Sequence, residues 1–400
     1  CISSAASDVY KRQHRGNNGS GIRRGNNSLF GFNRLAINDK STKAMQPFEF
    51  EGLIGVFNGE VYNADALRKT FNIKTNSKAD TEVILPLFAM FGPSMIQYLD
   101  GFYAGVIQDQ ETGEFFLLRD HVGKKPLFYC KSGKQRFFTS ELKAIETIDA
   151  FESIPRGLST YEEDNIILAE NHKIQAKEIG NLNAEIVQAV HKRIPIGEEH
   201  YGVFVSGGLD SSIIAQIVSQ ISKNVTYYTL GNKESEDSHY VHILTKALGI
   251  EKQLKFISLP DQELLPELIR KVVYATESWN PSIVSNGLAT YLLSEQAKKD
   301  GINVVLSGEG ADELFCGYPV TREANTWFAH RPELIENMQF TELRRLDLAS
   351  MANTIEVRCP FLDLSVYATA LECKLEDLIV RENGKLQGKR ILRKLFQETL

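Results

Sequence analysis

The residues best suited to chemistry lie between positions 203 and 212, where the chain reads VFVSGGLDSS. The apolar run predicts a buried parallel strand, the two glycines predict a tight turn, and Asp210 lies where a helix should begin. Backbone N–H groups at such a helix start, together with the nearby serine hydroxyls, suit a phosphate, and Asp210 can orient a metal ion that accompanies it. An ordinary glycine turn is the alternative, and the serines on both sides of the glycines disfavour it.

A second segment, residues 304–318, has the same design and reads VVLSGEGADELFCGY. An apolar strand again runs into a serine and a glycine, and the acidic residues Glu309, Asp312 and Glu313 follow. In open α/β sheets, ligands lie beyond the carboxyl ends of the strands, so the two turns are predicted to line one crevice. An acidic surface turn is the alternative.

The motif SGGLDSS resembles the pyrophosphate loop of ATP pyrophosphatases, which adenylate a carboxyl or carbonyl oxygen and release pyrophosphate. Taken with SGEGADE, it resembles the synthetase domain of asparagine synthetases. The resemblance implies that Val205 and Leu230 contact adenine or ribose, and plain core packing stays open for both. The residues implied to bind ATP and pyrophosphate are Val205, Ser206, Gly207, Gly208, Asp210, Ser211, Ser212, Leu230, Ser307 and Gly308.

The same resemblance implies roles for three further residues. Glu309 is expected to contact the acyl-adenylate and to assist the attack of ammonia. Asp312, with Asp210, is expected to support Mg²⁺ and the nucleotide. Lys389 is expected to neutralise the triphosphate, with a solvated helical lysine as the alternative. The motif EVRCPFLD at 356–363 is expected to shape the wall of the crevice.

Polar clusters in the amino-terminal half lie at the ends of predicted strands. They comprise HRG at 14–16, Arg34, Gln46 with Pro47, NGE at 58–60, Asp80 and RDHVGKKPLFY at 119–129. Each alone is typical of a solvated turn, but their order and spacing together resemble the glutaminase domain of class II glutamine amidotransferases. That resemblance implies that Arg34 pairs with the α-carboxylate of glutamine. It implies that Glu60 and Asp80 contact the α-amino group, and that Asn58 and Gly59 form an oxyanion hole.

In that family the nucleophile is a cysteine at the mature amino terminus, and Cys1 is a tempting candidate. The family's cysteine opens an apolar strand, whereas residues 1–7 read CISSAAS, which has no strand periodicity. Residues 3–13 instead resemble the translation of a transposon-type sequencing adapter. We therefore expect residues 1–13 to be an artefact and the native nucleophile to be missing. At the other end, residues 388–400 predict an amphipathic helix without a cap, so we also expect a truncated carboxyl terminus.

The elements predicted around these motifs form two domains of different class. Residues 14–160 predict an α+β domain, which the resemblance makes an Ntn-hydrolase-like sandwich, with one helical segment at 81–98 broken near Gly92. A connection is predicted at 161–180. Residues 181–400 alternate helices with strands and predict a doubly wound parallel sheet. The predicted strands are 30–37, 53–57, 102–108, 114–118 and 135–139, followed by 202–205, 225–230, 253–257 and 303–306.

Composition restricts the partners. A chain of 400 residues with a net charge of −6 and no basic stripe is not expected to bind nucleic acid. Its longest apolar stretch, at 83–91, contains Pro86 and is too short to span a bilayer. The five cysteines show no metal-ligand spacing and indicate a reducing cytoplasm. The oligomeric state stays open, a homodimer included.

The function that the resemblance implies is synthesis of asparagine from aspartate through a β-aspartyl-AMP intermediate, with release of AMP and pyrophosphate. Ammonia from glutamine would reach the intermediate through a dry tunnel. One departure bears on the acceptor, because Ser285 stands where an arginine is expected to hold the acceptor's carboxylate; aspartate or a related carboxylate is therefore expected. The alternatives are a β-lactam-synthetase-like enzyme, in which a tyrosine takes the place of Glu309, and a catalytically dead binding protein.

Overall fold

The computed structural model describes residues 11–195, 200–231, 236–318 and 323–397, and it divides into two compact units, Cys1–Lys173 and Ile174–Leu400. The boundary falls inside the segment expected to connect the domains. The first part of that segment is not a connection, however, because strand β11 (Asn165–Glu170) pairs with β10 (Gly157–Glu162). As an edge strand, β11 exposes most of its side chains and therefore lacks a clear apolar alternation.

The first unit is built on a six-stranded antiparallel sheet with the order β11-β10-β6-β5-β4-β3. Its remaining strands are β3 (Phe48–Phe50), β4 (Leu53–Val61), β5 (Gly101–Asp109) and β6 (Phe115–Arg119). Two smaller antiparallel sheets contain β1 (Ser20–Gly25) and β2 (Ser28–Asn33), and β7 (Phe128–Ser132), β8 (Gln135–Thr139) and β9 (Ala150–Ser153). The α-helices described in this unit are α2 (Ala64–Thr70) and α3 (Ile84–Phe91).

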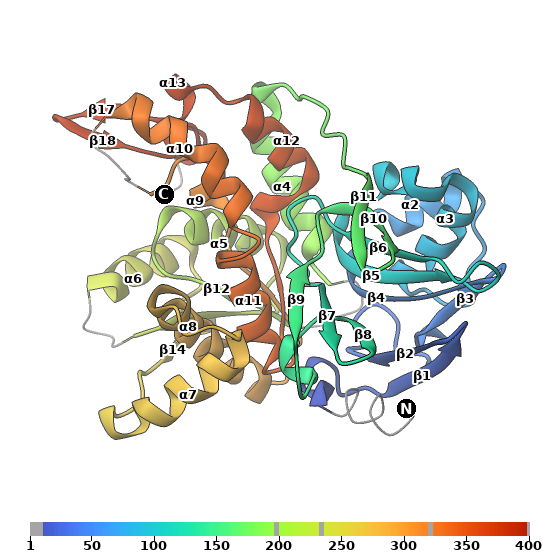
Figure 1. Cartoon of the computed structure of the whole chain (residues 1–400). Helices are drawn as coiled ribbons and strands as arrows, with labels where there is room; N and C mark the ends of the chain where they lie inside the picture. The colour runs from blue at the N-terminus through green and yellow to red at the C-terminus, as the bar shows by residue number, and fades with distance from the viewer. Residues whose placement is uncertain (1–10, 196–199, 232–235, 319–322, 398–400) are drawn as a thin grey trace. The chain divides into compact units, whose positions relative to one another are not determined.

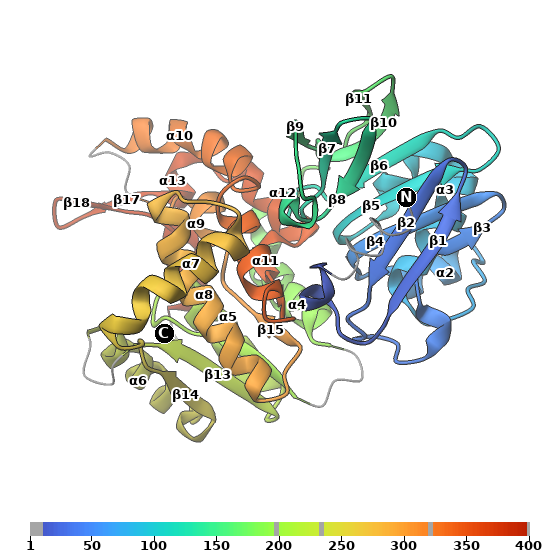
Figure 2. The ribbon, with the colours of Figure 1, turned by 60° about the horizontal axis from the view of Figure 1, so that its bottom comes forward.

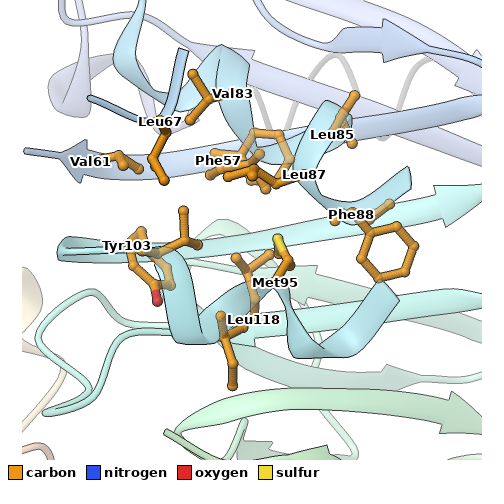
Figure 3. Close-up of a cluster of buried hydrophobic side chains, with 14 of the residues drawn as sticks. Phe57, Val61, Leu67, Val83, Leu85, Leu87, Phe88, Met95, Tyr103 and Leu118 are labelled. Carbon is orange, nitrogen blue, oxygen red and sulfur yellow. The ribbon is translucent and has the colours of Figure 1, made fainter. Parts of the chain in front are cut away.

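Alternate residues of the large sheet build separate cores on its two faces. Figures 1 and 2 show α2 and α3 on one face and the small sheets on the other. Phe57 and Tyr103 belong to the core beneath the helices (Figure 3), whereas Ala104 and Val106 belong to the core facing the small sheets. This period of two is the pattern expected of strands that are buried on both faces. It confirms the predicted class of α+β domain with packed sheets.

Most of the predicted elements of this unit are present, with one difference at a strand end. The strand predicted at 30–37 ends at Asn33. The helical segment predicted at 81–98 is broken as expected, since α3 ends at Phe91 and Gly92 adopts a φ of 54°. A 3-10 helix, Gly92–Tyr98, then completes the segment.

The second unit is built on a five-stranded parallel sheet with the order β14-β13-β12-β15-β16. Its strands are β12 (Tyr201–Phe204), β13 (Val225–Leu230), β14 (Leu254–Ile257), β15 (Val304–Leu306) and β16 (Glu356–Arg358). The helices are α4 (Leu182–Arg193), α5 (Leu209–Ile221), α6 (Glu236–Leu248), α7 (Leu265–Thr276), α8 (Pro281–Lys299), α9 (Ala311–Leu314), α10 (Ala324–Asn337), α11 (Glu342–Met351), α12 (Leu364–Glu372), α13 (Leu375–Leu378) and α14 (Arg390–Phe396). A short hairpin joins β17 (Val380–Glu382) to β18 (Lys385–Gln387).

Helices cover both faces of the parallel sheet, so the predicted doubly wound architecture is confirmed. Figure 1 shows α5 and α6 on one side of β12 and β14, and α7 and α8 on the other. Helix α11 packs against α7 and α8, and α4 packs against α5. In the described ranges no helix has both the length and the apolar character needed to span a membrane.

The strand order has a consequence for function. The first strand of the sheet, β12, lies between β13 and β15, so the winding of the chain changes direction beside it. In doubly wound sheets a ligand site lies at such a switch point, beyond the carboxyl ends of the strands. The two polar motifs identified in the sequence follow β12 and β15, the two strands that flank this point.

Candidate active sites

The SGGLDSS loop leads from β12 into α5, as the sequence predicts. Gly207 has a φ of 78°, a left-handed conformation that favours glycine. The hydroxyls of Ser206 and Ser211 lie 3.1 Å apart, and the Ser206 N–H donates to Ser211 Oγ over the same distance. Ser212 Oγ donates to the carbonyl of Gly208 at 2.8 Å. The serines therefore hold the loop in shape at the start of α5.

The second loop packs directly against the first. A Cβ atom added to Gly308 would lie 2.9 Å from Asp210 Cβ and 3.0 Å from the backbone nitrogen of Ser211. The N–H of Ser307 donates to the carbonyl of Arg358 at 2.9 Å, so the end of the EVRCPFLD strand anchors this loop. The structure thus brings the two predicted motifs together, and glycine is needed where they touch.

Lys389 reaches the same place from the other end of the unit. Its Nζ atom lies 2.5 Å from Asp210 Oδ2 and 2.5 Å from Asp312 Oδ1. The residue precedes α14 in a left-handed conformation, and its N–H donates to the carbonyl of Phe315 at 2.9 Å. With only 9% of its surface exposed, Lys389 is not a solvated helical lysine. Its position supports the functional interpretation.

The protonation states of Asp210 and Lys389 depend on each other and on Asp312. Burial raises the pKa of Asp210 to about 6, although Lys389 opposes the rise. Burial would lower the pKa of Lys389, but the two carboxylates raise it above its ordinary value, so the ammonium stays charged. Within the described residues, Asp210 Oδ1 is a buried oxygen without a hydrogen-bond partner. A charged lysine and an unsatisfied carboxylate oxygen are therefore available where the loops meet.

Glu309 lies in the second loop and pairs with a residue that the sequence analysis missed. Arg345 of α11 donates to Glu309 Oε1, and its other nitrogen donates to Thr290 Oγ1 at 3.2 Å. Burial raises the pKa of Glu309, and Arg345 opposes that rise. Neighbouring Glu313 is also buried; its pKa is raised to about 8, mainly by burial, and Tyr318 donates to it at 3.0 Å. No sequence motif marks Arg345, because its partner is 36 positions away.

Two predicted residues, and the departure at Ser285, are less clearly part of this site. Val205 is buried, and its N–H donates to the carbonyl of Tyr228, whereas Leu230 ends β13 and is half-buried. Either position is compatible with core packing, so nucleotide contact stays a prediction. Ser285 is exposed on α8, the helix whose Thr290 contacts Arg345. A guanidinium is thus present beside α8 although residue 285 does not supply it.

In the first unit, β4 carries the predicted oxyanion residues. Asn58 Nδ2 is buried and has no hydrogen-bond partner among the described residues, so its donor is available. Gly59 has a φ of 132°, and a Cβ atom there would lie 2.0 Å from the carbonyl oxygen of Phe102. Only glycine fits this position, and its conformation differs from that of an ordinary strand residue. A buried donor without a partner, as at Asn58, is what an oxyanion hole requires.

The other predicted glutamine-binding residues meet around a loop at 38–41. Asn38 Nδ2 donates to Glu60 Oε2 at 2.5 Å and to Asp80 Oδ1 at 3.2 Å. Arg34 is buried and donates to the carbonyls of Ser41, at 2.7 Å, and Asp39. The loop at 38–41 therefore contacts all three predicted residues. The sequence analysis did not single out Asn38, whose side chain makes two of these contacts.

The remaining amino-terminal motifs hold the backbone in place. Glu141 is fully buried and accepts contacts from His14 at 2.8 Å, Arg15 at 2.9 Å and Lys143 at 3.1 Å. In the RDHVGKKPLFY segment, Asp120 accepts the backbone N–H groups of residues 122, 124 and 125. We therefore assign HRG and RDH a structural role.

Most of the predicted artefact lies outside the description of the structure. Cys1 and residues 2–10 belong to the part that is not described. Of residues 1–13, the described ones include Lys11, which forms an ion pair with Glu146 at 3.0 Å, and Gln13, which begins the 3-10 helix Gln13–Arg15. The origin of this segment stays a prediction.

Family models and relatives agree on both units. A glutamine amidotransferase domain model matches residues 3–196, and an asparagine synthase model matches residues 181–339 and 333–400. A putative glutamine-hydrolysing asparagine synthetase of Methanocaldococcus jannaschii is 34% identical over 390 residues, covering 88% of this chain and 70% of the relative.

Two further relatives match almost the whole chain at a somewhat lower identity. Asparagine synthetase B of Escherichia coli is 30% identical, with 97% of this chain and 74% of the relative covered. The probable asparagine synthetase of Schizosaccharomyces pombe is also 30% identical, with 97% and 75% covered. With both loops, both units and these relatives in agreement, the chain belongs to the family of glutamine-hydrolysing asparagine synthetases.

Proposed function

We propose that this chain synthesises asparagine from aspartate, with ATP as the energy source and glutamine as the nitrogen donor. Family membership supports this reaction. The observation that carries it for this chain is the meeting of Asp210, Asp312 and Lys389 where the two glycine loops touch. That arrangement combines backbone donors, a buried ammonium and carboxylates, which are the groups that a triphosphate and its metal require.

In the first half-reaction, a carboxylate oxygen of the acceptor attacks the α-phosphorus of ATP, and the bond to the β-phosphate breaks. The leaving pyrophosphate would lie over the loop formed by Ser206, Gly207 and Gly208, with the N–H groups at the start of α5 as donors. Lys389 would neutralise charge on the phosphates, since its ammonium is buried beside the loop and stays protonated. The product is a β-aspartyl-AMP.

The carboxylates of this site fit Mg²⁺. Asp210 and Asp312 already converge on one cationic atom, and Asp210 has a further oxygen without a partner among the described residues. No cluster of three or more potential protein ligands occurs in the described part of the chain, so phosphate oxygens would complete the coordination. Magnesium would supply charge neutralisation as pyrophosphate leaves. We propose Asp210 and Asp312 as its protein ligands.

In the second half-reaction, ammonia attacks the acyl carbon, a carbon–nitrogen bond forms, and AMP leaves. The attacking nitrogen must also lose a proton. Glu309 is the carboxylate that we assign to the acyl-adenylate, and Arg345 is a positioning residue because it holds one oxygen of Glu309. The pairing aims Glu309 while leaving its second oxygen to act on the nitrogen.

In the amino-terminal unit, we propose that Arg34 binds the α-carboxylate of glutamine and that Glu60 and Asp80 bind its α-ammonium. The free amide of Asn58 and the N–H of Gly59 would stabilise the oxyanion that forms at the side-chain carbonyl. The donor of Asn58 supports this role because it is buried without a partner in the described structure. Ammonia released there would serve the second half-reaction.

Two further predictions from the sequence are also proposals. The four described cysteines are buried thiols outside any disulfide, which supports a reducing cytoplasm as the compartment. The identity of the acceptor is the second, because exposed Ser285 offers no cation of its own. We propose aspartate, and a related carboxylate is the alternative.

The test of the proposed function is exchange of labelled pyrophosphate into ATP, measured with aspartate and Mg²⁺. Replacement of Asp210 by alanine should lower the exchange rate by about 100-fold or more, since a charge-stabilising group is lost. Exposed Asp261, in the same unit, provides the matched control Asp261→Ala, which should exchange at the unmodified rate. Unchanged exchange in Asp210→Ala would end the assignment of the loop. A screen of other carboxylates in the same assay decides the acceptor.

A further inference from the structure

The site assigned to glutamine contains a side chain that already occupies part of it. The amide nitrogen of Asn38 donates to Glu60 Oε2 at 2.5 Å and to Asp80 Oδ1 at 3.2 Å. These are the two carboxylates to which we assign the α-ammonium of glutamine. A single nitrogen of Asn38 therefore lies between the same two acceptors that the ammonium needs.

The surroundings fix Asn38 in this place. The next residue, Asp39, accepts the N–H groups of Ser41 at 2.6 Å and Lys78 at 2.8 Å, and Arg34 donates to the carbonyls of both Asp39 and Ser41. The loop at 38–41 is thus bound on one side to the proposed carboxylate-binding residue and on the other to the segment leading to Asp80. Asn38 projects from a loop that is anchored at both ends of the proposed α-amino-acid site.

We propose that the side chain of Asn38 acts as a latch. It fills the ammonium subsite when no glutamine is bound, and an incoming α-ammonium displaces it. This proposal rests on the assignment of Glu60 and Asp80 under the proposed function. The amide keeps two carboxylates in register in a largely buried place, where Glu60 is only 7% exposed. Binding of glutamine then replaces the neutral amide donor of Asn38 with a charged ammonium, and charge-assisted hydrogen bonds are stronger than neutral ones.

Removal of the latch should change ligand affinity in the opposite direction from removal of an ordinary binding residue. If Asn38 contacted the bound ligand, its removal would weaken binding. As a competitor for the same oxygens, its removal should strengthen the binding of any ligand that carries the α-ammonium. A ligand without the ammonium leaves the latch in place and should not respond.

The experiment uses the full chain and two probes that it cannot hydrolyse, L-glutamate and glutarate, in isothermal titration calorimetry. L-Glutamate carries the α-ammonium and α-carboxylate, whereas glutarate lacks the ammonium. The variant Asn38→Leu keeps the size of the side chain but removes its donor. Asn38→Ala is a second variant in case the leucine prevents folding. The exposed Asn76 of the same unit provides the matched control, Asn76→Leu.

For Asn38→Leu we expect a dissociation constant for L-glutamate lower by about 2- to 10-fold, the equivalent of one or two neutral hydrogen bonds, with glutarate unchanged. An equal or higher dissociation constant for L-glutamate would overturn the latch alone, as would an equal gain for both probes. Failure of both the unmodified chain and the variant to bind L-glutamate would overturn the latch together with the glutamine site. The two failures are therefore distinguishable.

Discussion

Replacement of Lys389 by alanine tests the centre of the proposed synthetase site. The ammonium contacts Asp210 and Asp312 at 2.5 Å each, and only 9% of the residue is exposed. The variant leaves two neighbouring carboxylates without their shared cation. It should therefore lower both the stability of the carboxy-terminal unit and its ability to handle a triphosphate.

The size of the stability effect follows from the geometry. At an effective dielectric constant of about 20, unit charges separated by 2.5 Å attract each other by about 7 kcal/mol. Desolvation of the three groups and repulsion between the carboxylates offset much of this, and breaking a buried pair typically costs about 3–5 kcal/mol. Because the side chain of Asp312 is 32% exposed, the lower end, about 3 kcal/mol, is the expected loss. For a unit of this size, that loss lowers the Tm by about 6–12 °C.

Two assays report on the variant. Thermal unfolding gives the loss of stability, and titration with Mg²⁺ should raise the Tm of Lys389→Ala more than that of the unmodified chain. The reason is that Mg²⁺ can replace the missing cation between Asp210 and Asp312. Pyrophosphate exchange should fall by about 10²–10³-fold, as for loss of a preorganised charge-stabilising group. Lys385→Ala, which changes an exposed lysine on the nearby hairpin, is the matched control.

The reasoning would be refuted by a variant that melts within about 2 °C of the unmodified chain and exchanges pyrophosphate at its rate. That result would mean that the contacts of Lys389 carry neither stability nor function. A large loss of stability that Mg²⁺ does not reverse would support the ion pairs of Lys389. It would contradict the assignment of Asp210 and Asp312 as metal ligands.

Three further predictions concern other parts of the structure. Gly308→Ala should force the two loops apart and slow pyrophosphate exchange by about tenfold or more, whereas Gly180→Ala, where an added Cβ meets nothing within 4 Å, should not. Exchange should decline as the pH falls through about 6, because the pKa of Asp210 is raised to about 6 and the metal needs its ionised form; a rate independent of pH between 5 and 7 would contradict this. Although burial opposes it, Lys143 and Arg15 hold the pKa of Glu141 well below its usual range. The stability from ionised Glu141 is therefore present above the unfolded value of about 4.3 and is lost as the pH falls below it. Glu141→Gln should cost the amino-terminal unit about 3 kcal/mol near neutral pH, and an unchanged unfolding midpoint would show that the network is dispensable.

Much of the architecture could be predicted because local patterns reported it directly. The strand–turn–helix at 203–212 combines an apolar run, glycines and a polar helix start, and each of these acts over a few residues. The alternation of strands and helices after residue 181 likewise indicated a parallel sheet, which the structure confirms. Prediction was weakest at edge strands such as β11, whose largely exposed side chains leave little apolar periodicity to read.

The sequence by itself therefore determined the class of each domain and the residues of the two glycine loops, because backbone conformation and hydrophobic periodicity are local properties. Only the tertiary structure decided which side chains that are distant in the sequence come into polar contact. Lys389 meets Asp210 across 179 positions, Arg345 meets Glu309 across 36, and Asn38 meets Glu60 and Asp80 across 22 and 42. No local pattern predicts these contacts, since electrostatic pairing depends on distance in space. They arise because, within each unit, folding brings separate strands, helices and loops together, and burial there strengthens the interaction between charges.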